Sequence, residues 1–324
     1  MGRNILFITT DQQRYDSLGC NGGWVARTPV ADRLAADGIN FHRAYNQTTV
    51  CMPARSTMLT GQYVRTHGAA ATGIPLPEDA PSIAAHLREA GGYRTALLGK
   101  AHFEPAFDLE RRYEENRRWQ DGETGDWRGF DTSIQAAHVG SFGGNPVQHY
   151  GMWLQDRHPE WLTSFAPLLG ALPGGDTGAP ETMNNPIPRE LYHTDWVADL
   201  AITELDTYGD GDDWFIWLSF PDPHHPWDPP ESELGRVRWQ DLDLPPGHPG
   251  SDEAIAEVLG RKPAHWLACW EGTFVNQEGG PFTYRPQDLT HDNIREINAK
   301  THVMNELIDE ACGRVLDHLS AKGW

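Results

Sequence analysis

Short apolar runs alternate with amphipathic segments along most of this chain. Continuous apolar runs are typical of strands buried on both faces, and helical spacing of apolar residues predicts amphipathic helices. The expected strands are residues 4–10, 39–45, 93–98 and 214–218. The expected helices are residues 28–38, 53–61, 82–90, 194–208 and 292–319. Such alternation predicts an α/β fold in which helices sandwich a mostly parallel central sheet.

Two stretches depart from this alternation. Residues 103–193 and 229–288 are rich in glycine, proline and charge and are expected to be irregular. Irregular segments of such length are usually either functional or mobile. We therefore interpret 103–193 as an insertion that shapes a ligand pocket within one domain covering residues 1–324. Its large aromatic side chains either line this pocket or pack the insertion. They are Trp119, Trp127, Trp153 and Trp161.

Chemically active side chains follow the expected strands. Asp11 ends the first strand, Lys100 and His102 follow the third, and His224 follows the fourth. In open α/β sheets, ligands bind at the carboxyl ends of the strands. Asp11 either caps a turn or ligates a hard cation. As bare residues, Lys100 and His102 are more often solvated loop side chains than catalytic ones. The alternative for His224 is a solvated side chain in a loop fixed by prolines.

A further candidate lies in the stretch 50–61, V-C-M-P-A-R-S-T-M-L-T-G. Pro53 suits the first turn of a helix, which places Cys51 at the helix N-terminus. Backbone N–H groups and the helix dipole favour an anion there, and Arg55 adds a fixed positive charge about one turn later. A nucleophile at Cys51 would face an anionic substrate in a positive pocket. The plain alternative is a buried cysteine beside a helix.

The pattern Cys51-x-Pro53-x-Arg55 resembles the signature of the sulfatase family, in the alkaline-phosphatase-like superfamily. The sequence G-K-x-H at 99–102 resembles a second element of that family, and its H-x-P-[FW] element aligns on His224. The resemblance covers nearly all of the chain. It implies hydrolysis of a small-molecule sulfate monoester.

The resemblance also implies the chemistry of the site. Cys51 would be converted to formylglycine by a formylglycine-generating enzyme, and one hydroxyl of the aldehyde hydrate would attack sulfur. Asp11 and the modified Cys51 would bind a divalent metal, with Ca²⁺ as the expected ion. Gln12 stands where the family often has a second metal-binding aspartate, and we do not assign it as a ligand.

Further roles follow from the same resemblance. Arg55 and the metal would help to ionise the nucleophile, and Lys100 would hold the sulfate oxygens. His224 would protonate the departing alcohol, and His102 would take the proton of the second hydroxyl when sulfate is expelled.

Three alternatives remain open. The first is a phosphonate monoester or phosphodiester hydrolase of the same superfamily, although those enzymes tend to lack the pair Lys100 and His102. The second is an inactive fragment or a non-catalytic binding protein. The third is a Cys-His hydrolase, which would leave Pro53 and Arg55 unexplained and lacks a G-x-C-x-G sequence around Cys51.

The composition of the chain restricts the classes of molecule that it is expected to bind. The 324 residues carry 26 Lys and Arg against 46 Asp and Glu, a formal net charge of −20. This charge opposes binding to nucleic acid and to anionic membranes. The four cysteines show no CxxC spacing, which argues against a disulfide framework. With no leader-like or membrane-spanning apolar stretch, a cytoplasmic location is expected.

The final expected helix bears on the metal site. In sulfatases this helix leads to another strand, which ends in Asp followed by Asn or His, and then to a further lysine and a smaller subdomain. Residues 292–324 offer no such strand. We therefore expect metal binding and activity to need a carboxy-terminal segment from an extended or second chain.

Overall fold

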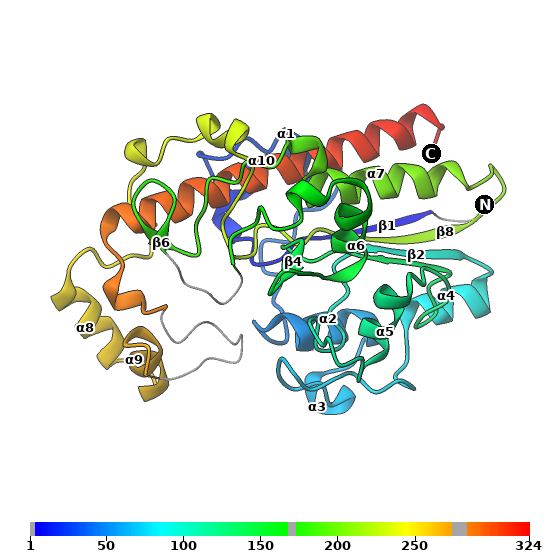
Figure 1. The fold of residues 1–324 in the computed structure, drawn as a ribbon, viewed down its shortest axis with the longest axis horizontal. Coiled ribbons are helices and arrows are strands. Elements are labelled where there is room, and N and C mark those ends of the chain that lie inside the picture. Colours follow the sequence, from blue (N-terminus) through cyan, green and yellow to red (C-terminus); the bar gives the residue numbers. More distant parts are fainter. Residues whose placement is uncertain (1–3, 168–172, 274–283) are drawn as a thin grey trace.

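A parallel sheet forms the centre of the molecule (Figure 1). The computed structural model describes residues 4–167, 173–273 and 284–324, and within these ranges the sheet has four strands in the order β1-β8-β2-β3. The strands are β1 (Ile5–Thr9), β8 (Trp214–Ser219), β2 (Arg94–Gly99) and β3 (Thr132–Gln135). All three neighbouring pairs are parallel, as the alternating pattern predicts.

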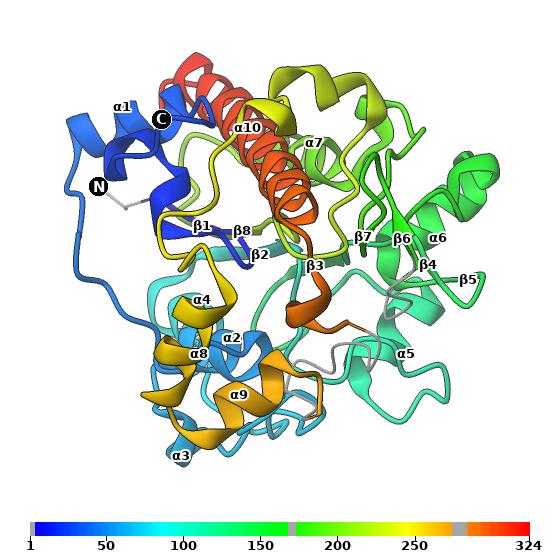
Figure 2. The same cartoon turned by 90° about the vertical axis from the view of Figure 1, so that its left-hand side faces the viewer.

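Helices cover both faces of this sheet, which confirms the predicted sandwich (Figures 1 and 2). The long helix α10 (His291–Ala321) and α7 (His193–Asp206) lie on one face, and α2 (Cys51–Thr60) and α4 (Ile83–Gly91) lie on the other. The other helices are α1 (Pro29–Asp37), α3 (Val64–His67), α5 (Glu114–Asp121), α6 (Gln148–Arg157), α8 (Asp252–Gly260) and α9 (Ala264–Trp270). Two small hairpins pair β4 (Ser141–Phe142) with β5 (Asn145–Pro146) and β6 (Pro173–Gly174) with β7 (Ala179–Pro180).

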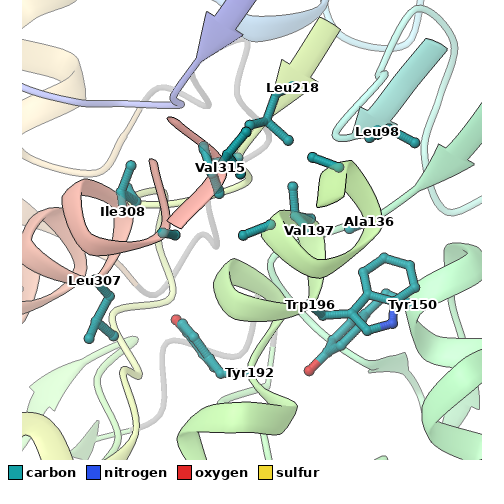
Figure 3. Packing of buried hydrophobic residues seen from close by; sticks show 14 of the residues in the cluster. Leu98, Ala136, Tyr150, Tyr192, Trp196, Val197, Leu218, Leu307, Ile308 and Val315 are labelled. Carbon is teal, nitrogen blue, oxygen red and sulfur yellow. The ribbon is translucent and has the colours of Figure 1, made fainter. Parts of the chain in front are cut away.

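The central strand β8 contributes to an apolar core on each face of the sheet. All six of its residues are buried. Leu218 lies in the cluster with Val197 of α7 and Val315 of α10 (Figure 3), whereas Trp217 lies in the opposite cluster with Leu59 of α2. Successive side chains of a strand point to opposite faces, so a strand buried on both faces is apolar throughout.

Strand β1 lies at an edge of the sheet. In the described ranges it pairs with β8 alone, and all five of its residues are partly exposed. The prediction of a strand at residues 39–45 is wrong. This segment is irregular and leaves Ile39 and Phe41 79% and 72% exposed. It connects α1 to α2 along the surface (Figure 2), and no strand in the described part of the chain pairs with its alternating apolar residues.

The two segments that were expected to be irregular contain regular elements. Residues 103–193 include α5, α6 and the sheet strand β3, and residues 229–288 include α8 and α9. The expectation failed at β3 because its sequence, T-S-I-Q, is short and mostly polar. The interpretation of 103–193 as an insertion stays a prediction, and residues 168–172 and 274–283 lie outside the described ranges. None of the described helices has the length and apolar character needed to cross a membrane.

Candidate active site

Three neighbouring strands end at the same level of the sheet. Ser219, the last residue of β8, pairs with Thr9 of β1 and with Gly99 of β2. Lys100 follows β2 directly, and its backbone N–H donates to the Ser219 carbonyl at 2.8 Å. Asp11 follows β1 by two residues. The carboxyl ends of these strands therefore bring Asp11 and Lys100 to one edge of the sheet.

Arg55 connects helix α2 to all three strand ends. Its guanidinium is buried, and Nη1 donates to the Lys100 carbonyl at 2.8 Å and to Ser219 Oγ at 2.8 Å. Nη2 lies 3.2 Å from Asp11 Oδ2. Because the N–H groups of a guanidinium are fixed in one plane, these contacts set the orientation of the N-terminal turn of α2.

Lys100 and Asp11 form a buried ion pair. Lys100 Nζ lies 2.7 Å from Asp11 Oδ2, and the two residues are 4% and 7% exposed. Burial alone would raise the pKa of Asp11, but the charges of Lys100 and Arg55 outweigh it and hold that pKa well below its usual range. Two cations beside one carboxylate leave local positive charge in a chain whose net charge is −20. An anionic substrate requires such a local excess.

Cys51, the first residue of α2, lies between two cavities. The first cavity has a volume of about 340 Å³ and the second about 460 Å³. The first is lined, among others, by Cys51, Lys100, Phe107, His102, His138 and His224. The second is lined, among others, by Cys51, Asp11, Gln12, Asn46, Thr48 and Arg55. A reactive group on Cys51 thus has the histidines on one side and Asp11 on the other.

The two predicted histidines of the first cavity are buried and neutral at ordinary pH. Burial, with the charge of Lys100 next, lowers the pKa of His102 to about 4. The same two causes lower the pKa of His224 well below its usual value. His224 Nδ1 faces the backbone carbonyl of His225, which can only accept a hydrogen bond. In the neutral ring the proton is therefore on Nδ1, and Nε2 carries a lone pair.

His138 belongs to this cavity, although the sequence pattern did not indicate it. Its ring stacks on His224 with centroids 4.2 Å apart and an interplanar angle of 19°, and the ring of Phe107 meets it edge-on. It is 5% exposed. His138 follows β3, so the rule that selected the other strand-end residues would also have indicated it if β3 had been expected.

Residues between 103 and 193 do line the first cavity, but the four tryptophans are not among them. Trp119 and Trp127 are each 2% exposed, and Trp153 and Trp161 pack against the core beside α7. The suggestion that they line the pocket is therefore wrong. The rings of Trp119 and Trp127 are buried and those of Trp153 and Trp161 are partly buried against the core, which removes apolar surface from water.

Gln12 holds an unusual position beside Asp11. Its backbone is in the left-handed region, with φ of 57°, and its Oε1 accepts a hydrogen bond from the His225 N–H at 3.1 Å. This contact joins the end of β1 to the loop that carries His224. Within the described ranges, no group of three or more His, Cys, Asp or Glu side chains is arranged to hold a metal ion.

The chain belongs to the sulfatase family, because the Sulfatase family model matches residues 3–320. The fold agrees with this assignment. A crystal structure of the phosphonate monoester hydrolase of Agrobacterium radiobacter superimposes with a TM-score of 0.70 at 26% identity, covering 99% of this chain and 60% of that one.

Two curated relatives have a similarly low sequence identity to this chain. An arylsulfatase of Clostridium perfringens is 26% identical over 255 residues, which are 76% of this chain and 48% of the relative. The multifunctional alkaline phosphatase superfamily protein PehA of Trinickia caryophylli is 27% identical over 331 residues, which are 99% of this chain and 60% of PehA. The chain therefore spans about half to three fifths of the length of these relatives.

Proposed function

We propose that this chain carries the active site of a sulfatase that hydrolyses a small-molecule sulfate monoester with a nucleophile formed on Cys51. The observation that carries the proposal is the position of Cys51 at the N-terminus of α2, with Arg55 and Lys100 beside it. The positive charge of both side chains suits the oxygens of an anionic ester. A cavity of about 340 Å³ suits a small substrate.

Formylglycine, made from Cys51 by a formylglycine-generating enzyme, would supply a hydrated aldehyde with one hydroxyl to attack sulfur and a second to release the sulfate afterwards. Lys100 would hold the sulfate oxygens. His102 is neutral, so it can accept the proton of the second hydroxyl.

The role proposed for His224 requires its charged form. Because Nδ1 donates to the His225 carbonyl, the neutral ring has no proton on Nε2 to give to a leaving alcohol. Protonation of the ring is disfavoured by burial and by Lys100, whereas the negative charge of a bound ester favours it. We propose that substrate binding charges His224 and so prepares it to act as the acid.

The described residues provide only part of a metal site. Asp11 supplies a carboxylate, and Gln12, Asn46 and Thr48 add neutral oxygens around the second cavity. Oxygen ligands suit a hard divalent cation such as Ca²⁺, but such an ion usually takes six or more. We propose Asp11 and the modified Cys51 as ligands and derive no step that depends on the metal.

We propose that a further strand, from an extended or a second chain, completes this site. Among the described strands, β1 has a neighbour on one side only, and native sheets usually cover such an open edge. A cavity of about 190 Å³ lies between α1 and α10, and Ile8 of β1 contributes to its lining. Its apolar lining includes Ile8, Leu18, Val30, Leu34 and Ile308. An added strand that bears apolar side chains would cover this surface.

A phosphonate monoester hydrolase is the second candidate. It is favoured by the crystal structure that superimposes on 99% of this chain. The presence of Lys100 and His102 favours sulfate. The test compares an aryl sulfate with an aryl phosphonate monoester that has the same leaving group, using protein co-expressed with a formylglycine-generating enzyme and Cys51→Ala as the background.

We expect kcat/KM to be at least about tenfold higher for the sulfate. An equal or reversed preference would favour the phosphonate. If neither ester is turned over above the Cys51→Ala background, the non-catalytic alternative is favoured.

A further inference from the structure

We propose that Glu115 is a positioning residue that fixes the turn carrying His102 against the first cavity. Its carboxylate accepts hydrogen bonds from three successive backbone N–H groups. Oε1 accepts from His102 at 3.0 Å, and Oε2 accepts from Phe103 at 2.9 Å and from Glu104 at 3.1 Å. We call this arrangement the Glu115 clamp. The proposal rests on the function proposed above for His102.

Further hydrogen bonds, which involve Glu104 and Arg128, hold the Glu115 clamp in place. The backbone N–H of Glu115, in the first turn of α5, donates to Glu104 Oε2 at 2.7 Å. Arg128 Nη2 donates to Glu104 Oε1 at 2.9 Å and to the Leu76 carbonyl at 3.0 Å. Glu115 and Glu104 are 0% and 3% exposed. The turn is therefore held by a closed, buried network.

His102 needs such support because of its backbone conformation. Its φ is 56°, in the left-handed region that a residue with a bulky side chain rarely adopts unless its surroundings hold it there. This conformation accompanies the placement of the imidazole in the wall of the cavity with Cys51 and Lys100. Glu115 does not itself line that cavity, so it acts on the site through His102.

Only a carboxylate satisfies all three N–H groups. In Glu115→Gln, the amide oxygen can accept hydrogen bonds, but the amide nitrogen is a donor and would face at least one backbone N–H. At least one buried donor then loses its partner, which is costly. The substitution keeps the size of the side chain, so it tests the hydrogen bonds and charge separately from packing.

The experiment measures backbone amide exchange and turnover in Glu115→Gln. The matched control is Glu114→Gln on the same helix, whose side chain is 36% exposed and lies 3.8 Å from Arg118. Burial and the neighbouring Glu104 raise the pKa of Glu115 to about 7, so measurements are made about one unit above that value, where the carboxylate is ionised.

We expect amides 102–104 to exchange at least about tenfold faster in Glu115→Gln, with β2 unchanged. With an aryl sulfate, kcat falls by at least about tenfold and KM falls with it, while kcat/KM changes little, because His102 acts on the covalent intermediate after the alcohol has left. Glu114→Gln changes neither the exchange of amides 102–104 nor kcat. Glu115→Asp, which keeps the carboxylate on a shorter stem, gives intermediate exchange, and it provides the test if Glu115→Gln does not fold.

Wild-type exchange at amides 102–104 in Glu115→Gln would overturn the proposal. So would faster exchange with unchanged kcat, or exchange in Glu115→Asp as fast as in Glu115→Gln. If the unsubstituted protein hydrolyses no sulfate ester, the proposed function fails, and the exchange rates alone still decide whether the Glu115 clamp holds the turn.

Discussion

At the residue scale, Lys100 combines two tasks. Its ammonium lies 2.7 Å from Asp11 in a buried ion pair, and it also lines the cavity beside Cys51. As a bare residue in the sequence, it would more often be a solvated lysine. Its burial and its ion pair indicate instead that the side chain supports the charge balance of the site.

We expect Lys100→Ala to lower kcat for a sulfate ester by about 10²–10³, the usual cost of removing a pre-positioned group that stabilises developing charge. The midpoint of thermal unfolding should also fall, because Asp11 loses one of its two cationic partners. The measurements are steady-state kinetics and thermal unfolding. The control is Lys262→Ala, which removes an exposed lysine beside Trp266. A change in kcat below about threefold would remove Lys100 from the catalytic scheme.

Short sequence patterns could predict the residues whose spacing is set by one local element. Cys51 and Arg55 are one helical turn apart, and Lys100 and His102 share one loop. His138 and Glu115 could not be found in this way. The proposed role of Glu115 depends on hydrogen bonds from three backbone N–H groups that precede it by more than ten residues in the sequence. No local sequence pattern indicates such a contact.

At the element scale, the strands that are buried on both faces were easier to predict from the sequence than the short or polar ones. Strand β8 is buried on both faces and was expected with nearly its observed bounds. Strand β3 is short and polar and was missed. The apolar segment 39–45 was expected to be a strand and is not, because hydrogen bonding to a neighbour, rather than alternation alone, makes a strand.

His149 of α6 ties this helix to β3 through a neutral imidazole. Its Nδ1 accepts a hydrogen bond from the Gln135 N–H at 3.1 Å, and Nε2 therefore donates to the Glu123 carbonyl at 3.0 Å. Burial lowers the pKa of His149 to about 4. Protonation of Nδ1 would break the hydrogen bond to Gln135 and place a charge in the interior.

The direction of the pH effect follows from this pKa. The unfolded chain binds a proton at His149 near its ordinary pKa of 6.5, whereas the folded protein does so only near 4. The contribution of His149 to stability is therefore complete above about pH 6.5 and is lost as the pH falls toward 4. The loss amounts to about 3 kcal/mol.

We expect the free energy of unfolding to depend less steeply on pH in His149→Gln than in the wild type between these two pH values. Denaturant unfolding at several pH values measures this slope. The control is His86→Gln, which changes an exposed histidine of α4 and should keep the wild-type slope. An unchanged slope in His149→Gln would contradict the account.

At the scale of the whole molecule, the edge of β1 that no described strand covers lies next to the proposed metal site. Asp11 follows β1 and lines the second cavity, and Ile8 of β1 lines the cavity between α1 and α10. We expect residues 1–324 alone to bind Ca²⁺ with a Kd of about 10⁻³ M or weaker, and to show little turnover.

Calorimetric titration with Ca²⁺ tests this expectation. A version that includes a strand able to pair with β1 and ending in Asp plus Asn or His should bind the ion at least about tenfold more tightly. The control is Asp11→Asn in the extended version, which should lose most of the gain. Tight binding and ordinary turnover by residues 1–324 alone would show that the site is completed from within this sequence.

The proposed mechanism requires that the nucleophile is made from Cys51. The most direct test is the mass of the peptide that contains residue 51, after co-expression with a formylglycine-generating enzyme. We expect the mass of the aldehyde or its hydrate at residue 51, with Cys20, Cys269 and Cys312 still as thiols. A Cys51 thiol that persists under co-expression, while the same enzyme converts a known sulfatase made alongside, would contradict it.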